Sequence, residues 1–200
     1  MRSDALALAL LLIPAQPCST QQPTGRERWQ RVAEVLEAVG ARPGAVVADV
    51  GAGSGFYTLR LSRAVGAEGR VFAVDIAPSA LARLRSISRQ PGRDNIVVVE
   101  GRADDPRLPS DSLDAVLIVN AYHEMEAHEA MLSRLFAALK PGGRLVLLEP
   151  FDSTRRLPTR EAQRAAHVIA RELAVADLER RGFEVVRQEA GWARDPQRRT

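Results

Sequence analysis

The stretch Asp49-Val50-Gly51-Ala52-Gly53-Ser54-Gly55 joins a short apolar run to a segment with helical periodicity. The apolar run, residues 45–50, is broken only by its acid, as is typical of a strand covered on both faces. The helical segment spans residues 56–65 and stops at a glycine. Glycines at alternate positions let the backbone turn sharply and approach a ligand closely. The stretch therefore predicts a ligand-binding loop between a buried strand and a helix.

The same alternation of strand-like and helix-like segments continues along the chain and predicts one α/β domain, residues 26–200. Parallel neighbouring strands need crossover helices, so the order predicts a doubly wound, mostly parallel Rossmann-like sheet with helices on both faces. Six strands are expected, and residues 1–25 read as an apolar leader and linker. The further strands fall at 71–74, 96–99, 115–119, 145–148 and 183–188, and the helices at 28–39, 56–65, 79–88, 126–139 and 159–181, the last with a break near Ala174.

A second acid, Asp75, ends the strand that follows the glycine-rich loop. Ligands of such sheets bind at the carboxyl ends of the strands, where a carboxylate can accept the hydroxyls of a ribose. A dinucleotide fingerprint, G-x-G-x-x-G, would also use this arrangement, but its third glycine position is occupied by Phe56. An NAD(P)-dependent oxidoreductase is therefore the less favoured alternative.

The pattern D-x-G-x-G-x-G, followed by Asp75, resembles the first motif of class I S-adenosylmethionine-dependent methyltransferases. The stretch Leu139-Lys140-Pro141-Gly142-Gly143 resembles the family's L-K-P-G-G turn into the fifth strand. The resemblance covers residues 26–188 and is nearest to small-molecule methyltransferases, including the quinone C-methyltransferases and the arsenite methyltransferases. It implies S-adenosyl-L-methionine as cofactor and a small-molecule methyl acceptor. The cofactor-binding residues it implies are Asp49, Gly51, Ala52, Gly53, Gly55, Asp75, Ile76, Asp104 and Asn120.

One segment departs from the family pattern. Many relatives have Gly-Asp-Ala where this chain has Gly101-Arg102-Ala103, so the acid that would accept from the adenine amino group is displaced to Asp104 or Asp105. We favour Asp104. Alternatively, both acids only cap the loop before Pro106.

The acceptor side is expected in residues 120–125, directly after the fourth strand. His123 is the candidate for a base or for orienting a nucleophile, because imidazole exchanges protons near neutral pH. Tyr122 is expected to line the acceptor pocket. The competing interpretations are that His123 only bonds backbone carbonyls and that Tyr122 only packs. With an incomplete acceptor pocket, the chain would be a cofactor-binding protein without catalysis.

Composition and charge indicate which binding partners and metals to expect. Aromatic residues make up 4% of the chain and the net charge is only +3, with arginines interspersed among acids, so no nucleic-acid partner is expected. Cys18 is the single cysteine, which excludes an intrachain disulfide. Glu124 and Glu126 lie near His123, but no third ligand follows at the usual spacing, so the sequence predicts no metal.

Both ends of the chain carry expectations of their own. The apolar run of residues 5–13 is too short to span a bilayer and lacks a clean cleavage site, so a cytoplasmic protein without a stable membrane span is expected. Export or tethering through residues 1–18 is the alternative. Residues 194–200 make a poor strand and are expected to be disordered, with the usual seventh strand missing or truncated. The sixth strand would then dock loosely or pair with another chain, and the protein would self-associate through this sheet edge.

Overall fold

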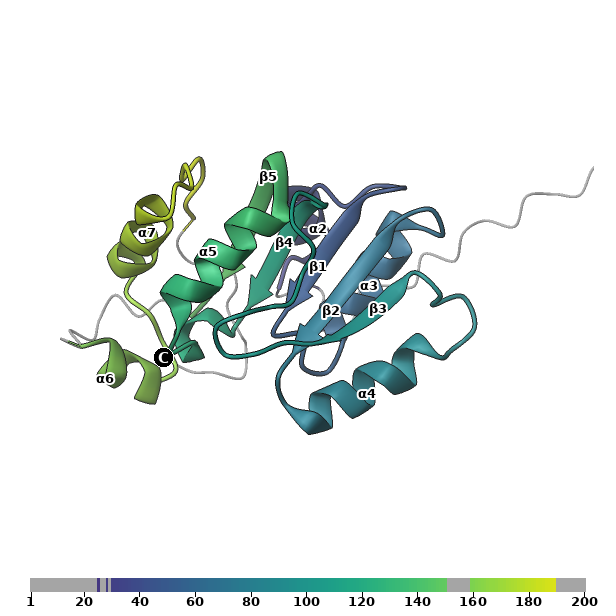
Figure 1. The fold of residues 1–200 in the computed structure, drawn as a ribbon, viewed down its shortest axis with the longest axis horizontal. Coiled ribbons are helices and arrows are strands. Elements are labelled where there is room, and N and C mark those ends of the chain that lie inside the picture. The colour runs from purple at the N-terminus through teal and green to yellow at the C-terminus, as the bar shows by residue number, and fades with distance from the viewer. Residues whose placement is uncertain (1–24, 26–27, 29, 151–158, 190–200) are drawn as a thin grey trace, which may run out of the picture.

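The computed structural model describes residues 25, 28, 30–150 and 159–189 (Figure 1). The expectations for the leader and for residues 194–200 lie outside these residues. The elements in chain order are α2 (Val32–Val39), β1 (Val46–Val50), α3 (Phe56–Val65), β2 (Arg70–Asp75), α4 (Pro78–Ser88), β3 (Ile96–Glu100), β4 (Leu113–Val119), the 3-10 helix η1 (Tyr122–Glu124), α5 (His128–Ala138), β5 (Leu139–Leu148), α6 (Arg160–Ala165) and α7 (Arg171–Arg180).

The strands form one five-stranded parallel sheet in the order β3-β2-β1-β4-β5. Strand order reverses at β1, which lies between β2 and β4, so the chain is wound in both directions from the centre. This confirms the predicted doubly wound α/β fold. The glycine-rich loop follows β1 and thus lies at the point of reversal, where open α/β sheets bind their ligands.

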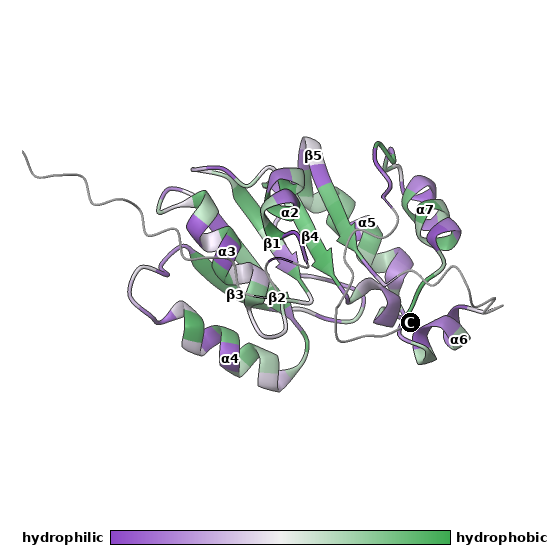
Figure 2. Cartoon of the chain, turned by 180° about the vertical axis from the view of Figure 1, so that it is seen from behind, coloured by the Kyte–Doolittle hydropathy of each residue, from purple (hydrophilic) through white to green (hydrophobic). Residues whose placement is uncertain are grey.

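Helices cover both faces of the sheet, as Figures 1 and 2 show from opposite sides. Successive side chains of a strand point to opposite faces, and both faces of β1 are buried. Val47 packs with residues of α2 and α3, whereas Ala48 and Val50 pack with residues of α5. The central strands are accordingly mostly hydrophobic (Figure 2), which is why β1 is an apolar run interrupted only by Asp49.

The predicted sixth strand is wrong. Residues 183–189 form no strand, and β5 is the last strand of the sheet among the described residues. Phe183 packs its ring edge to face against Phe136 of α5, with 5.1 Å between centroids, while Val186 is 84% exposed. Phe183 and Val185 are half-buried while Glu184, Val186 and Arg187 are exposed, so the segment gains little from burial.

The long helix predicted over 159–181 is interrupted, but not near Ala174, which lies inside α7. Helix α6 ends at Ala165, and His167 adopts a left-handed backbone conformation with φ +53°. The side chain of Gln163 accepts a hydrogen bond from the Ala170 N–H at 2.7 Å and thereby supports the turn into α7. None of the described helices is long and apolar enough to cross a membrane.

Candidate cofactor and acceptor site

The glycine-rich loop is pressed against the neighbouring elements at two of its glycines. Gly51 has φ +74°, and a Cβ there would lie 2.5 Å from the Cβ of Ala121, just beyond β4. Gly55 has φ +77°, and a Cβ there would lie 2.7 Å from Ile87 Cδ1 in α4. The left-handed backbone favours glycine at both positions; at Gly51 a Cβ would also collide with that of Ala121, whereas at Gly55 the tip of the Ile87 side chain would have to shift. The close approach at Ala121 brings the ends of β1 and β4 together.

Gly53 is different, because its surface is open. With φ +52° it also needs a left-handed conformation, but a Cβ there would find only Gly51 O, at 3.9 Å. Gly53 therefore leaves free space beside the backbone at the tip of the loop. A ligand can approach the main chain closely at this position.

Asp75, at the end of β2, holds the loop in place. Its Oδ2 accepts the Gly53 N–H at 2.8 Å, and its Oδ1 accepts the N–H groups of Ile76 and Ala77 at 2.8 and 2.9 Å. A carboxylate has about four acceptor positions, so roughly one remains after these three bonds. Asp75 can therefore hold the loop and still accept a ligand hydroxyl.

Asp49 lies beneath the loop and not on its open side. Only 2% of the residue is exposed, and its Oδ2 accepts the Thr58 hydroxyl at 2.6 Å. Burial raises the pKa of Asp49 to about 6, although the Thr58 hydrogen bond opposes the shift. Asp49 thus anchors the start of α3 under the loop.

The remaining predicted cofactor residues lie at the ends of strands β1 to β4. Ala52 is 8% exposed, and its N–H, like that of Gly51, bonds to Val74 O in β2. Ile76 is 60% exposed, which is unusual for a large apolar side chain beside a carboxylate. Asn120 is exposed with φ +57°, a conformation that asparagine tolerates better than most residues.

The two acids after β3 differ in what they bind. Asp105 Oδ1 accepts the Arg107 N–H at 2.7 Å, which closes the loop as an acid in a turn commonly does. Asp104 is exposed. This difference favours Asp104 as the acid left for a ligand, while its contact with adenine stays a prediction.

The segment after β4 is organised by a buried carboxylate, that of Glu149 beyond β5. Glu149 Oε1 accepts the N–H groups of Ala121 and Tyr122, both at 2.8 Å. Its Oε2 lies 2.6 Å from His123 Nδ1. Because the Glu149 oxygens accept from the backbone N–H groups, Nδ1 is taken as the donor of this contact. The Nε2 nitrogen of a neutral His123 ring then carries the lone pair.

His123 itself is 3% exposed. Its Nε2 lies 3.7 Å from Glu124 Oε1, and its ring packs edge to face on His167, with 5.8 Å between centroids. The predicted alternative, in which His123 bonds backbone carbonyls, does not describe these contacts. The ring is held between a buried carboxylate and a histidine from the turn after α6.

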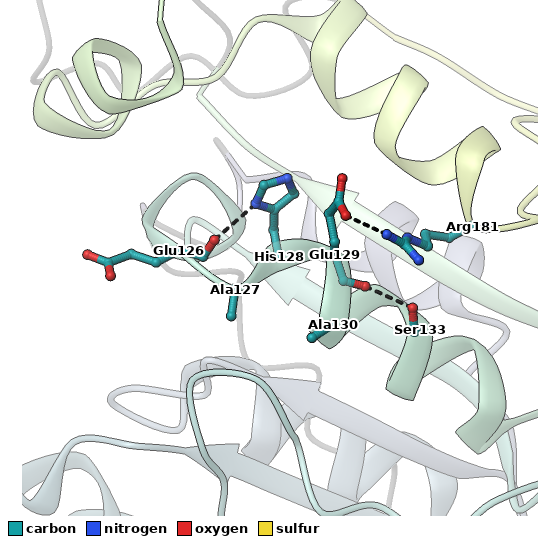
Figure 3. Close-up of a pocket in the computed structure, with 7 residues that line it drawn as sticks. All are labelled: Glu126, Ala127, His128, Glu129, Ala130, Ser133 and Arg181. Carbon is teal, nitrogen blue, oxygen red and sulfur yellow. Dashed lines mark hydrogen bonds and ion pairs between the residues drawn. The ribbon is translucent and has the colours of Figure 1, made fainter.

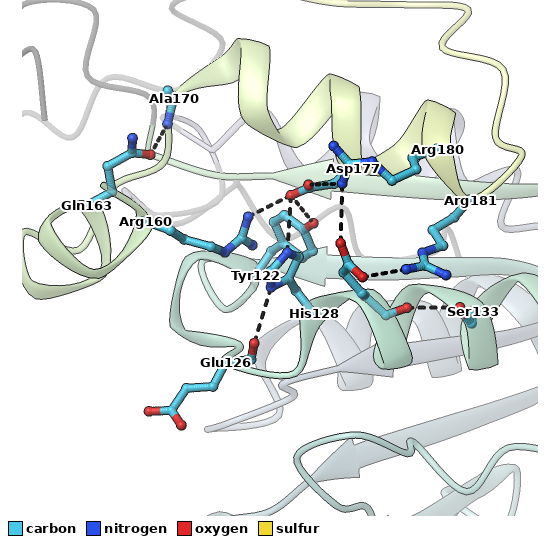
Figure 4. A network of polar contacts seen from close by, with 11 residues as sticks. Tyr122, Glu126, His128, Ser133, Arg160, Gln163, Ala170, Asp177, Arg180 and Arg181 are labelled. Atoms are coloured by element: carbon cyan, nitrogen blue, oxygen red, sulfur yellow. Dashed lines mark hydrogen bonds and ion pairs between the residues drawn. The ribbon is translucent and has the colours of Figure 1, made fainter. Parts of the chain in front are cut away.

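Tyr122 is completely buried and faces the helices (Figure 4). Its hydroxyl donates to Asp177 Oδ2 at 2.9 Å, and the Arg160 guanidinium lies 5.1 Å from the ring centroid and 2.6 Å from the same carboxylate oxygen. Burial and then the charge of Asp177 raise the pKa of Tyr122. The structure gives this tyrosine a packing role between α5, α6 and α7, while the predicted catalytic role stays a prediction.

A hollow of about 570 Å³ lies on the outer side of α5, next to the end of α7 (Figure 3). Its polar walls include Glu129, which pairs with Arg181 at 2.5 Å and accepts the Ser133 hydroxyl at its backbone carbonyl, 2.9 Å away. None of the predicted cofactor residues lines it. The hollow is therefore separate from the candidate cofactor site.

Three residues that the sequence did not single out shape this region: Glu149, Asp177 and His167. Glu149 directly follows β5, close to the position that Asp75 has as the last residue of β2, and that position was the available signal. His167 lies in the turn after α6 and Asp177 lies in α7. For these segments the sequence does not indicate which residues face the sheet.

The arrangement of loop, acid and strand ends resembles that of class I S-adenosylmethionine-dependent methyltransferases, and residues 47–143 match a family described as a methyltransferase domain. Over 126 residues, or 60% of the chain, it is 36% identical to a ubiquinone/menaquinone biosynthesis C-methyltransferase of Vibrio campbellii. The chain spans about half, 46%, of that relative's length.

Solved structures give the same class. A SAM-dependent methyltransferase from Aquifex aeolicus superposes with a TM-score of 0.68 at 26% identity, covering 80% of this chain and 85% of that one. An arsenic (III) S-adenosylmethionine methyltransferase from Chlamydomonas reinhardtii, with a TM-score of 0.62 at 21% identity over 77% of this chain and 61% of that one, shares the fold. In sequence and in fold the domain is thus similar to S-adenosylmethionine-dependent methyltransferases, which supports S-adenosylmethionine as the cofactor. The alternative of an NAD(P)-dependent oxidoreductase is not supported.

Proposed function

We propose that this protein transfers a methyl group from S-adenosylmethionine to a small-molecule acceptor. The observation that carries the proposal is the bond from the Gly53 N–H to Asp75, which joins the open loop to a carboxylate with acceptor capacity to spare. Open space at Gly53 and a free acceptor position at Asp75 fit the amino-acid part and the ribose of the cofactor. Ile76, exposed beside them, supplies an apolar surface for the adenine.

The cofactor supplies an already activated methyl group on a sulfonium, so the protein's task is mainly placement. Asp75 would accept a ribose hydroxyl, and Gly53 would let the cofactor approach the main chain. Ala121, in contact with the loop at Gly51, fixes the distance between the cofactor side and the residues after β4. Such positioning, with water excluded, accounts for much of the catalysis in transfers from a good donor.

We propose that His123 is the residue that acts on the methyl acceptor. Its Nδ1 is occupied by Glu149, so Nε2 is the atom available for orienting an acceptor or accepting a proton. The buried carboxylate fixes the ring orientation in the same way as in other oriented histidines. Glu149 is then a positioning residue. Tyr122 is placed differently, because its hydroxyl proton is engaged by Asp177 of α7.

The names of the relatives suggest which acceptors to test first. The Vibrio campbellii protein is named for ubiquinone and menaquinone biosynthesis, and the Chlamydomonas reinhardtii protein for arsenic(III). Quinols, phenols, thiols and arsenite should therefore be offered with cofactor labelled in its methyl group. Label transfer to one class supports the proposal. Tight cofactor binding without transfer to any class would favour a binding protein without catalysis.

The cofactor can be tested independently of the acceptor. S-adenosylmethionine should raise the melting temperature, because a ligand that binds the folded state stabilises it by mass action. NAD(H) at the same concentration should leave it unchanged. A shift with NAD(H) alone would reverse the assignment.

We also propose that copies of the chain associate through the outer edge of β5, where no other described strand pairs. An exposed strand edge is a template for pairing with a second chain. Sedimentation over a wide concentration range should show a growing dimer fraction. A single monomeric species at all concentrations would contradict it.

A further inference from the structure

The structure brings three metal-ligating side chains together after β4: His123, Glu124 and His167. Each offers one ligand atom, and these atoms all lie within 4.8 Å of one another. Two of the residues are neighbours in η1, whereas His167 comes from the turn after α6. The sequence predicts no metal because a third ligand is missing at the usual spacing, and His167 supplies that ligand from a distant part of the chain.

We propose that His123 Nε2, Glu124 Oε1 and His167 Nδ1 bind a divalent first-row transition metal ion such as Zn²⁺. Glu124 Oε1 lies 3.7 Å from His123 Nε2 and 3.4 Å from His167 Nδ1. Ligand atoms of a tetrahedral ion with bonds near 2.0–2.1 Å are about 3.3 Å apart. Both distances are within a few tenths of an ångström of that value. The third pair, His123 and His167, is bounded only by the 4.8 Å that holds for all three atoms, so the exposed His167 side chain would have to move in to complete the site.

The strongest support is the contact behind His123. A metal-binding histidine usually donates its other ring N–H to a carboxylate, which fixes the ring and makes the ligand nitrogen more basic. His123 Nδ1 lies 2.6 Å from Glu149 Oε2, and both side chains are almost fully buried. Glu149 is itself held by the N–H groups of Ala121 and Tyr122. The lone pair of His123 is thus aimed toward Glu124 and His167 by a rigid support.

The charges of the site also favour a divalent cation. Glu124 and Glu149 carry two negative charges, and the two imidazoles are neutral when they bind a metal. The nearby cation of α6, Arg164, pairs with Glu126 and not with Glu124. Two imidazoles and one carboxylate suit Zn²⁺ and similar ions better than Mg²⁺ or Ca²⁺, which prefer oxygen ligands. With three protein ligands, a fourth position stays open to water or another small ligand. Because metal binding uses the His123 Nε2 lone pair, it is this open position, and no longer Nε2 itself, that could orient an acceptor when the ion is bound.

Metal binding can be measured without any methyl acceptor, so failure of this proposal and failure of the proposed function are distinguishable. The full chain, without a histidine tag and freed of metal by a chelator, is titrated with Co²⁺ and followed by visible absorption. Zn²⁺ affinity is then measured by competition with a chromophoric chelator. The expected result is saturation at one ion per chain, with Co²⁺ bands typical of four or five ligands.

The variants test where the ion binds. His167→Gln and Glu124→Gln change exposed side chains, 70% and 59% accessible, so the fold should persist, as circular dichroism can check. Each should weaken Zn²⁺ binding about 10-fold or more, since loss of a direct ligand should cost at least as much as loss of a supporting group. The matched controls His128→Gln and Glu126→Gln remove the same residue types beside the site and should keep the parent's affinity.

Two outcomes would overturn the proposal. One is the absence of saturable Co²⁺ or Zn²⁺ binding by the parent protein. The other is equal affinity in His167→Gln, Glu124→Gln and the parent, which would place any bound ion elsewhere on the chain.

Discussion

The buried Asp49 should make the protein less stable as the pH rises through the acid range. The pKa of Asp49 is raised from 3.8 to about 6 by burial under the glycine-rich loop. The folded protein therefore binds this proton more tightly than the unfolded chain does. The resulting stabilisation is fully present below pH 3.8 and is lost as the pH rises through about 6. A shift of roughly two units, at about 1.4 kcal/mol per unit, corresponds to about 3 kcal/mol.

Asp49→Asn tests this reasoning, because the amide has nearly the same shape and does not ionise. Its oxygen can still accept the Thr58 hydroxyl. Urea unfolding of the parent and the variant between pH 4 and pH 7.5 gives the difference in unfolding free energy at each pH. That difference should change by about 2 to 3 kcal/mol in favour of Asp49→Asn as the pH rises, and should level off above pH 7. A difference that does not vary with pH would refute the raised pKa.

Three further substitutions separate the roles of neighbouring residues. Gly51→Ala should destabilise the fold, because its Cβ would lie 2.5 Å from that of Ala121, and the melting temperature should fall by several degrees. Gly53→Ala places its Cβ in open space but strains the left-handed backbone by about 1 kcal/mol, so S-adenosylmethionine binding should weaken by more than the loss of stability; unchanged affinity in a calorimetric titration would contradict the open surface at Gly53. Tyr122→Phe removes the bond to Asp177 and should cost about 1 to 3 kcal/mol in chemical unfolding. Turnover should survive that change if the tyrosine only packs, and a large loss of turnover in a still-folded variant would restore its catalytic role.

The sequence alone predicted the helices and strands whose hydrophobic pattern reflects the burial of their own residues. The helix predicted over 56–65 matches α3 at both ends, because a glycine flanks it on each side. The apolar run of β1 predicts a strand covered on both faces, and Val47 and Ala48 do pack into opposite layers. The loop and Asp75 meet as expected because the carboxyl ends of parallel strands lie on one edge.

The region after β5 was not predictable in the same way. A short apolar segment such as 183–188 reads as a strand, yet its pairing depends on long-range partners that local pattern does not encode. The interruption at His167 rests on a left-handed backbone and on the Gln163 side chain, neither of which has a strong sequence signal. For the same reason, the contact between His167 and Glu124 could not be anticipated from spacing.

The most direct test of the central claim is calorimetric titration of S-adenosylmethionine into the parent and into Asp75→Asn. The amide keeps one oxygen for the backbone N–H groups but loses the charge that a ribose hydroxyl would meet. We expect the parent to bind one cofactor per chain, and the variant to bind it about 10-fold or more weakly, which corresponds to the roughly 1.5 to 3 kcal/mol of a hydrogen bond to a charged group. Equal affinity of both proteins, with both still folded, would contradict the assignment of this sheet edge as the cofactor site.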